Sequence, residues 1–215
     1  MKVINCQKES PHKYFYQKDY DDLFRFISYY YQIELIREIQ PRTILEIGLG
    51  NKFVSNYLSW HGYHIVTCDL EAELLPEVVG DIKNLPFKAS SFEVVAAYEV
   101  LEHLPWEFLP QVLVELKRVT CKYVLLSVPY SGLSAEIILR FPLVWKLFKS
   151  LFIDLFIRVP YFYRKFKPGD EHYWELGWRG YSLKRFKKLI PQGMTIIKEV
   201  RPVLKTYHHF FVLKK

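Results

Sequence analysis

The stretch Thr43-Ile44-Leu45-Glu46-Ile47-Gly48-Leu49-Gly50 decides the fold. Its first five residues predict a buried strand, and the two glycines follow where that strand would turn into a helix over 53–61. Glycine at such a turn lets the backbone approach a ligand without a Cβ in the way. The helix that follows offers free N–H groups and the positive end of its dipole. A Gly-x-Gly pair is weak evidence alone, so the remaining sequence has to support a binding site.

Strands and helices alternate along most of the chain. The hydrophobic pattern predicts further strands at 64–69, 78–82, 92–98, 123–128, 195–203 and 208–213, and helices at 22–39, 106–119 and 183–190. Such alternation implies βαβ units and a largely parallel sheet. The last two strands are close enough in sequence to pair as a hairpin.

Acidic side chains follow the predicted strands in order. Asp69 ends the second strand, where its carboxylate can accept hydrogen bonds from the two hydroxyls of a ribose. Asp81 ends the third, after Gly80, where a carboxylate can accept from the exocyclic amine of adenine. Tyr98 and Glu99 stand at the end of the fourth strand. This ordered set is far more specific than any one motif.

The set resembles the class I S-adenosylmethionine-dependent methyltransferases of the small-molecule type, strongly over 43–130 and more loosely in the C-terminal third. The resemblance implies an α/β, Rossmann-like fold with a seven-stranded, mostly parallel sheet, helices on both faces and an antiparallel last strand. It implies S-adenosyl-L-methionine as cofactor, bound at the C-terminal ends of the strands. The residues that it assigns to cofactor binding are Glu46, Gly48, Gly50, Asp69, Leu70, Asp81, Ile82, Tyr98 and Glu99.

One position departs from that family. A third glycine often follows Gly50, and here Lys52 stands in its place, preceded by Asn51. Asparagine tolerates a left-handed turn, so we expect the loop still to form. A dinucleotide-binding Rossmann domain is the alternative, but its fingerprint requires a glycine where this chain has Phe53.

The segment 171–178 is a dense cluster of polar and aromatic residues. In the resembling families the corresponding region faces the substrate, which makes His172 the candidate general base. Tyr130 follows Pro129 at the C-terminal end of the fifth predicted strand and is a second candidate catalytic residue that could line the pocket. The alternative is that these side chains simply anchor a loop. Methyl transfer needs little acid–base help, because alignment with the electrophilic sulfonium supplies much of the rate.

The sequence predicts no metal site. Cys6, Cys68 and Cys121 are widely spaced, which excludes a cysteine-based zinc site. The run Glu99-Val100-Leu101-Glu102-His103 lacks the first histidine of an inverted zincin motif, so His103 is expected to pack at the sheet edge or to act near the substrate. His208 and His209 are adjacent in a predicted strand and therefore face opposite sides.

Residues 131–168 form an insertion that carries seven basic and two acidic residues, a net charge of +5 out of +7 for the whole chain. Apolar residues at three- and four-residue steps predict an amphipathic helix over 142–160. Its apolar face could pack on the domain, form a dimer contact, cover a hydrophobic substrate or lie on a membrane surface. The sequence does not choose between these and does not specify an oligomeric state.

The length of 215 residues predicts a single domain over 1–215, with an N-terminal helical cap over 1–40. Tyr14, Tyr16 and Tyr20 within the cap could cover the cofactor. The first residues lack the apolar core of a secretion signal, and no 18 consecutive residues are free of charge. We therefore expect a cytoplasmic protein, with peripheral membrane contact through 142–160 as an added option.

Two functions are compatible with these residues. The first is methyl transfer from S-adenosyl-L-methionine to a small acceptor, hydrophobic or lipid-linked. The second is cofactor binding without catalysis, in a partner or scaffold. Nucleic acid is not expected as the acceptor, because Tyr98-Glu99-Val100-Leu101 stands where nucleic-acid enzymes carry a tetrapeptide such as Asn-Pro-Pro-Tyr.

Overall fold

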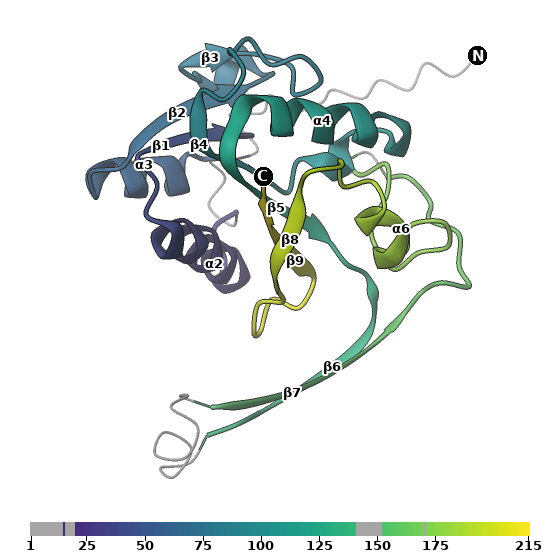
Figure 1. Cartoon of the computed structure of the whole chain (residues 1–215). Helices are drawn as coiled ribbons and strands as arrows, with labels where there is room; N and C mark the ends of the chain where they lie inside the picture. Colours follow the sequence, from purple (N-terminus) through teal and green to yellow (C-terminus); the bar gives the residue numbers. More distant parts are fainter. Residues whose placement is uncertain (1–14, 16–19, 141–151, 170) are drawn as a thin grey trace, which may run out of the picture.

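A seven-stranded sheet forms the centre of the computed structural model, which describes residues 15, 20–140, 152–169 and 171–215. The strands are β1 (Thr43–Ile47), β2 (His64–Asp69), β3 (Val78–Val79), β4 (Phe92–Tyr98), β5 (Thr120–Pro129), β8 (Thr195–Val200) and β9 (His208–Lys214). Their order is β3-β2-β1-β4-β5-β9-β8 (Figure 1). The first five strands are parallel, and β9 is antiparallel to both of its neighbours. The predicted fold class is confirmed.

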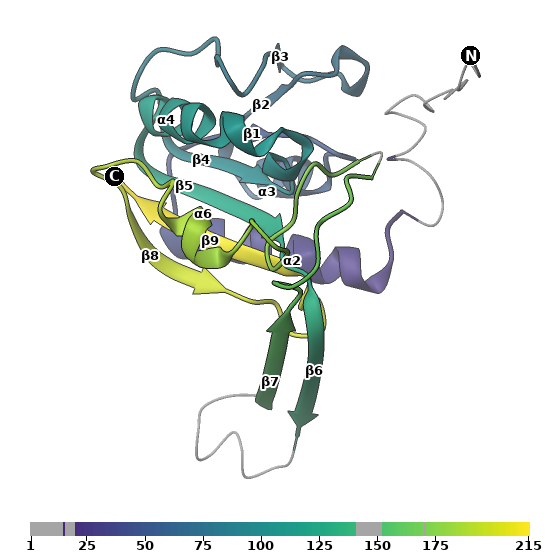
Figure 2. The same ribbon diagram turned by 90° about the vertical axis from the view of Figure 1, so that its right-hand side faces the viewer.

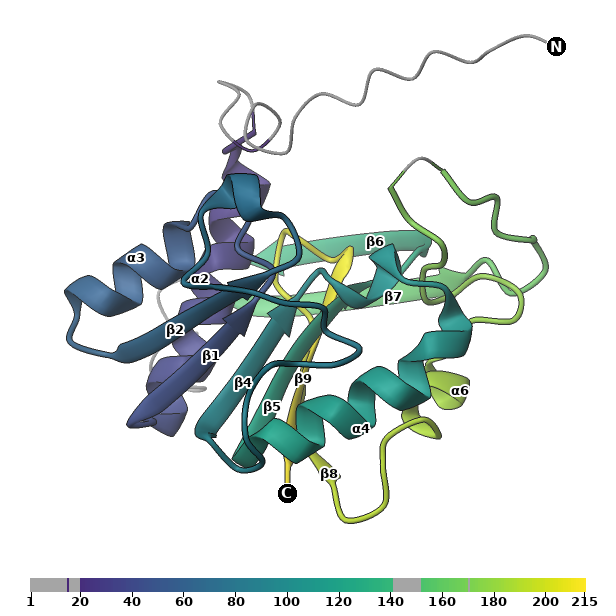
Figure 3. The same cartoon turned by 90° about the horizontal axis from the view of Figure 1, so that it is seen from above.

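Helices cover both faces of this sheet. Figure 3 shows α2 (Leu23–Ile39) and α3 (Phe53–Trp60) on one side, and α4 (Leu109–Val119) and α6 (Leu183–Lys187) on the other. Three short 3₁₀ helices lie in the connections: η1 (Ala72–Leu74), η2 (Leu101–His103) and η3 (Trp106–Phe108). The Asp22 side chain caps α2 by accepting from the Arg25 N–H at 2.7 Å, and α2 ends two residues before Pro41.

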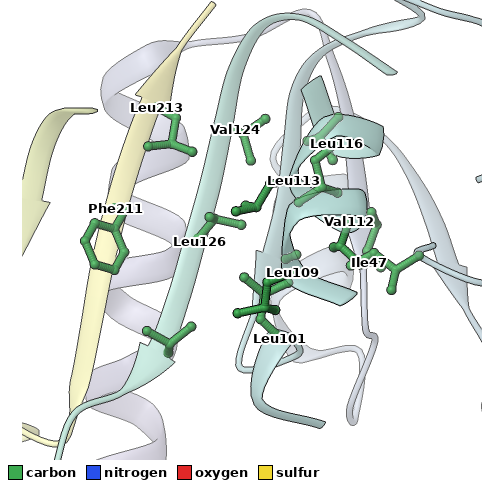
Figure 4. Close-up of a cluster of buried hydrophobic side chains, with 14 of the residues drawn as sticks. Ile47, Leu101, Leu109, Val112, Leu113, Leu116, Val124, Leu126, Phe211 and Leu213 are labelled. Atoms are coloured by element: carbon green, nitrogen blue, oxygen red, sulfur yellow. The ribbon is translucent and has the colours of Figure 1, made fainter. Parts of the chain in front are cut away.

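Alternate residues of each strand face the two helical layers. Leu109, Val112, Leu113 and Leu116 of α4 pack against the β5 and β9 side chains Val124, Leu126, Phe211 and Leu213 (Figure 4). On the opposite face, Ile33 and Ile36 of α2 belong to a second core with Ile44 and Phe210. Both faces of the parallel strands are therefore buried, as the near-continuous apolar strand sequences predict.

The predicted helix over 142–160 is wrong in its second half. Residues Ile153–Pro160 are strand β7, which pairs in antiparallel register with β6 (Gly132–Leu139), from Gly132 opposite Pro160 to Leu139 opposite Ile153. Residues 142–151 of the predicted helix lie outside the described residues. The reason for the error is that Ile153, Leu155, Ile157 and Val159 also alternate at period two, and β-branched side chains favour that reading.

The β6–β7 hairpin extends away from the sheet (Figures 1 and 2). One of its faces is polar and is tied to the body, because Arg201 pairs with both Glu136 and Asp154. Arg158, on the same face, lies 4.2 Å from the centre of the Tyr130 ring. The other face is apolar and exposed: its side chains are Leu133, Ile137, Leu139, Leu155, Ile157 and Val159. The hairpin therefore presents apolar surface outwards.

Smaller differences from the predicted elements have local causes. The third strand ends at Val79 rather than Ile82, because Asp81 forms an isolated bridge with Asn84 in a turn. The late helix stops at Lys187 rather than Ile190. Among the described residues, no helix combines the length and the apolar character needed to span a bilayer.

Candidate cofactor and acceptor site

Four parallel strands end side by side at one edge of the sheet. The register pairs Ile47 with Cys68 and with Ala97, and Asp69 with Val79, so the residues that follow β1, β2, β3 and β4 share this edge. The chain leaves β1 towards β2 on one side and reaches β4 on the other, which makes this the point where the strand order reverses. Ligands of open α/β sheets bind in the crevice at such a point.

Gly48 begins the loop after β1 in the left-handed region, at φ 81°. A Cβ on Gly48 would lie 2.4 Å from Cγ2 of Val100, so no larger residue fits. Its N–H donates to the Cys68 carbonyl at 3.0 Å. Gly50, at φ 52°, lies near the Tyr20 hydroxyl, which would be 3.8 Å from an added Cβ. Tyr14 and Tyr16, the other two predicted covering tyrosines, lie outside the described residues.

The third position of the loop behaves as the missing glycine would. Lys52, not Asn51, adopts the left-handed conformation, at φ 62°. The Asn51 side chain instead accepts from the Phe53 N–H at 3.1 Å and thereby caps the start of α3. Asn51 also donates to Asp21, and Lys52 Nζ donates to the Leu75 carbonyl at 2.8 Å. The loop therefore forms without a third glycine, but by a different residue from the one predicted.

Asp69 joins this loop to the end of β2. One carboxylate oxygen accepts from the Leu49 N–H at 2.8 Å, and the other accepts from the Glu71 N–H at 2.9 Å. Each carboxylate oxygen has a second lone pair that can still accept a ligand hydroxyl. The next side chain, Leu70, is 64% exposed and offers apolar surface at the same edge. Asp69 and Leu70 therefore both lie at the edge that carries the glycine loop.

Asp81 follows at the end of β3. Its Oδ1 accepts from the Lys83 N–H at 2.9 Å, and its Oδ2 lies 3.2 Å from Lys83 Nζ. Gly80 is required before it, because an added Cβ would lie 3.0 Å from Cys68 Sγ and 2.9 Å from Pro86 Cδ. The Ile82 side chain is buried in the α4-side core, which leaves its backbone as the part available to a ligand.

Glu46 lies under the loop, within the sheet. It is buried, its Oε2 has no hydrogen-bond partner among the described residues, and burial raises its pKa to about 8. The Asp69 charge adds to this shift, whereas a hydrogen bond from Ser55 opposes it. A positively charged group bound at this edge would therefore favour ionisation of the Glu46 carboxyl.

Tyr98 is the last residue of β4 and Glu99 follows it, but their side chains have different surroundings. The Tyr98 hydroxyl donates to the Gln32 carbonyl at 3.3 Å on the α2 side, so its side chain does not join the other candidate residues. Glu99 has a left-handed backbone, at φ 53°, and its N–H is held by the Ser127 carbonyl at 3.1 Å and hydroxyl at 3.0 Å. Strained non-glycine residues of this kind cluster at functional sites.

A polar cluster surrounds the Glu99 carboxyl. Its Oε2 lies 3.3 Å from Nε2 of His208, and burial raises the pKa of Glu99 to about 7. The same burial lowers the pKa of His208 well below 6.5. Ser28 of α2 holds the other ring nitrogen of His208 at 2.9 Å.

The segment after residue 170 is fixed beside η2 and the end of β5. The Tyr173 N–H donates to the Glu102 carbonyl at 2.8 Å, and the Leu176 N–H donates to the Pro129 carbonyl at 2.9 Å. Trp174 is fully buried and donates from its indole to the Leu104 carbonyl at 3.0 Å. The tryptophan is thus an anchor, and the anchor places His172 at the sheet edge.

His172 is half-buried and pairs with Glu175, with 3.0 Å between Nδ1 and Oε1. Burial opposes ionisation of Glu175, but hydrogen bonds from His172, Ser131 and Tyr207 outweigh it and lower the pKa of Glu175 to about 2. Tyr130, the other candidate, lies between Arg158 and the His209 ring, whose centre is 5.7 Å from its own. His172 and Tyr130 are both near the end of β5, since the Ser131 N–H next to Tyr130 bonds the Leu176 carbonyl.

The sequence reasoning missed four members of this cluster: Glu102, Glu175, Tyr207 and His208. Tyr207 donates to Oε1 of Glu175 at 2.6 Å, although 32 residues separate them. The available signals were polar residues placed in apolar strand or helix patterns, such as Glu102 between Leu101 and Leu104. Buried polar residues of this kind are rare unless paired or functional.

Comparison with known proteins agrees with this geometry. Residues 45–126 match the family model described as a methyltransferase domain. The chain is therefore similar to a methyltransferase domain over this stretch. A search of curated proteins finds no match. The matched stretch includes the glycine loop, Asp69, Asp81 and all of β4, which form the edge described above.

Solved structures share the fold of this chain at low identity. Magnesium protoporphyrin IX methyltransferase (ChlM) from Synechocystis PCC 6803, solved with bound SAH, is 14% identical with a TM-score of 0.61, covering 95% of this chain and 93% of that one. The N-methyltransferase NodS from Bradyrhizobium japonicum WM9, in complex with S-adenosyl-L-homocysteine, is 10% identical with a TM-score of 0.58, covering 96% of each chain. An S-adenosylmethionine-dependent methyltransferase from Clostridium acetobutylicum ATCC 824 is 13% identical with a TM-score of 0.57, covering 90% of this chain and 92% of that one.

Proposed function

We propose that this protein binds S-adenosyl-L-methionine and transfers its methyl group to a small acceptor. The observation that carries the proposal is the bond from the Leu49 N–H to the Asp69 carboxylate, which joins the glycine loop to the acid at the end of β2. The methyltransferase domain match over 45–126 supports it independently. In this proposal Asp69 holds the ribose, Asp81 faces the adenine amine, and the loop above Glu46 receives the methionine end.

Calorimetry with S-adenosyl-L-methionine and with S-adenosyl-L-homocysteine tests the proposal directly. We expect saturable binding of both to the full chain. NADH serves as the comparison, because the loop lacks the last glycine of a dinucleotide fingerprint at Phe53. Tight NADH binding with none for S-adenosyl-L-methionine would overturn the assignment.

The acceptor is proposed to bind beside His172 and Tyr130. Transfer forms a bond between the acceptor's O, N or C atom and the methyl carbon, breaks the carbon–sulfur bond and leaves S-adenosyl-L-homocysteine. An O–H or N–H acceptor loses a proton in the process. Because Nδ1 of His172 is bonded to Glu175, Nε2 is the nitrogen that would accept this proton. Alignment with the sulfonium supplies the larger part of the rate.

Cofactor binding without catalysis is the alternative function. Both functions share Asp69 and Asp81, so binding alone does not separate them. Formation of S-adenosyl-L-homocysteine in the presence of small hydroxyl, amine and hydrophobic acceptors does. The buried acidic cluster of Glu99 and Glu102 favours an enzyme, because uncompensated buried carboxyls lower stability and persist where chemistry needs them.

We further propose that residues 1–215 act as one unit on the cytoplasmic side, with peripheral membrane contact through the β6–β7 hairpin and the segment between its strands. The exposed apolar face of the hairpin supports this, since Leu133 and Ile157 are each 70% exposed. Arg140, Lys146 and Lys149 between the strands suit an anionic lipid surface. The sequence predicts membrane contact through a helix over 142–160. The proposal keeps the membrane as the partner and assigns the contact to the hairpin instead.

A further inference from the structure

We propose that Glu102, His103 and His172 bind one divalent first-row transition-metal ion at the acceptor end of the site. One ligand atom of each residue lies within 4.8 Å of the others. Donor atoms around a single ion lie within about 4.4 Å of one another when each is about 2.0–2.2 Å from the metal, so little closing is needed. The sequence predicts no metal site, because the run Glu99–His103 lacks the first histidine of an inverted zincin motif; the fold adds His172 to Glu102 and His103.

Two segments build the cluster, and backbone contacts hold them in place. Glu102 and His103 belong to η2, directly after β4, whereas His172 belongs to the segment fixed beside it. The Tyr173 N–H donates to the Glu102 carbonyl at 2.8 Å, and Nδ1 of His103 lies 2.7 Å from the Glu171 carbonyl. The three side chains are thus positioned by backbone bonds that do not depend on an ion.

Both imidazoles are oriented as metal ligands are. Nδ1 of His103 faces a carbonyl oxygen and Nδ1 of His172 faces the Glu175 carboxylate, and both partners can only accept. Each Nδ1 therefore carries the hydrogen, which leaves a lone pair on each Nε2. A histidine held in this way by a carbonyl or carboxylate is the common second-sphere arrangement around metal ions. Glu175 is itself held by Tyr207 at 2.6 Å and by Trp178 at 3.3 Å.

Glu102 supplies the independent indication that a ligand belongs here. The residue is fully buried, and neither carboxylate oxygen has a hydrogen-bond partner among the described residues. Glu99, three residues earlier, has a second buried and unpartnered oxygen, Oε1. An ion satisfies these oxygens and stabilises the ionised form of the two adjacent carboxyls. The competing arrangement is a proton held between Glu99 and Glu102, which makes a different experimental prediction.

The donor set selects the class of ion. Two imidazoles with a carboxylate suit Zn²⁺, Mn²⁺, Fe²⁺ or Co²⁺, whereas Mg²⁺ and Ca²⁺ prefer oxygen ligands. Three protein ligands leave coordination positions open, as in catalytic zinc sites. His103 is exposed, so an ion can enter from solvent. With the ion bound, Nε2 of His172 is a metal ligand and no longer the general base. An acceptor oxygen in an open position would then lose its proton because the ion lowers its pKa. This step rests on the proposed function, whereas ion binding does not.

The test is a titration of the chelator-treated full chain with Zn²⁺, Mn²⁺ or Co²⁺ alone, followed by calorimetry and, for Co²⁺, visible absorption. We expect one ion per chain and a shift of the Co²⁺ spectrum on binding. His103→Ala and His172→Ala should each weaken binding at least tenfold, and so should Glu102→Gln. The exposed His61, at the C-terminal end of α3, provides the matched control His61→Ala, which should bind as the parent does.

Glu175→Gln adds a variant that keeps all three ligands. It should still weaken binding about tenfold through His172 alone, as second-sphere changes do. Absence of saturable binding, or equal affinity in His172→Ala and His61→Ala, overturns the proposal. A Glu102→Gln chain that gains thermal stability while no ion raises the melting temperature of the parent identifies the shared proton instead. Cofactor calorimetry without metal is measured separately, so failure of one proposal does not count against the other.

Discussion

The N–H of Leu49 donates to the carboxylate of Asp69 across 2.8 Å, so the loop after β1 and the end of β2 are one structural unit. Asp69 also accepts from the Glu71 N–H at 2.9 Å, so each of its carboxylate oxygens is held by one backbone N–H. A ligand hydroxyl that bonds Asp69 therefore meets a carboxylate that cannot rotate away. This arrangement makes Asp69 the most informative residue for testing cofactor binding.

Asp69→Ala should weaken S-adenosyl-L-methionine binding by about 1–3 kcal/mol, because it leaves polar partners unsatisfied. It should also lower the melting temperature, since the Leu49 and Glu71 N–H groups lose their acceptor. Calorimetry and thermal unfolding measure the two effects. Glu73→Ala is the matched control, because Glu73 is an exposed acid on the adjacent η1. Equal binding by both variants would remove Asp69 from the cofactor site.

Asp81→Asn tests adenine selectivity. The substitution keeps the shape but presents a donor to the adenine amine, and one of the two oxygens that face Lys83 is lost. We expect a larger loss of S-adenosyl-L-methionine affinity than in Lys52→Gly, measured under the same conditions. Should Asp81→Asn bind as well as the parent chain, Asp81 serves only to shape the turn after β3.

Lys52→Gly should stabilise the fold relative to Lys52→Ala. Both variants lose the bond from Nζ to the Leu75 carbonyl, but only glycine relieves the left-handed backbone at φ 62°. The expected difference is about 1 kcal/mol in the free energy of unfolding, measured by urea denaturation. A more stable alanine variant would show that the Lys52 backbone is not strained.

Glu46→Gln should change how stability depends on pH. Burial raises the pKa of Glu46 to about 8, so the folded state holds a proton that the unfolded state releases above its ordinary pKa of 4.5. Stability of the parent therefore falls as pH rises from about 5 to 8, with a slope of at most about 1.4 kcal/mol per pH unit from this group.

The glutamine variant lacks that proton equilibrium. Its stability relative to the parent should increase between pH 5 and 8 and level off above 8. Urea unfolding at several pH values measures the difference. A constant difference across the range would mean that Glu46 ionises normally. Ser55→Ala, which removes the hydrogen bond that opposes the shift, should move the parent's transition to higher pH.

Removal of the hairpin tests the proposed membrane contact. Leu133 pairs directly with Val159, so residues 134–158 can be replaced by an Asn-Gly turn between them. Phe166 stays in place in this variant, with its ring 5.6 Å from that of Trp178. We expect a folded chain that still binds the cofactor but no longer sediments with anionic vesicles. A parent chain that ignores such vesicles contradicts the proposal.

Much of the fold could be predicted because the strands are short apolar runs bounded by clear signals. β1, β2 and β4 have the predicted bounds, since glycine or an acidic residue follows each buried run. The hairpin could not be predicted in the same way, because residues 153–160 satisfy the helical and the strand period at once. Pairing with Gly132–Leu139, a tertiary contact, decides between them.

The candidate site also contains residues that sequence order predicts and residues that only tertiary contacts bring together. Asp69 and Asp81 follow strands and could be placed from sequence order alone. The cluster of Glu102, His103 and His172 could not, because the contact of Tyr173 with Glu102 brings it together across the fold. The backbone of Lys52 could not be predicted either, because the surrounding loop holds it in the left-handed region, which lysine rarely adopts.

The place of β9 in the sheet has a consequence for biosynthesis. β9 is the last strand in the sequence, yet it lies between β5 and β8 and pairs with both. Until residues 208–214 have left the ribosome, β5 and β8 keep unpaired edges, and open strand edges recruit other chains. The nascent chain is thus prone to aggregate for as long as β8 has emerged and β9 has not, and shielding by chaperones matters most during that interval.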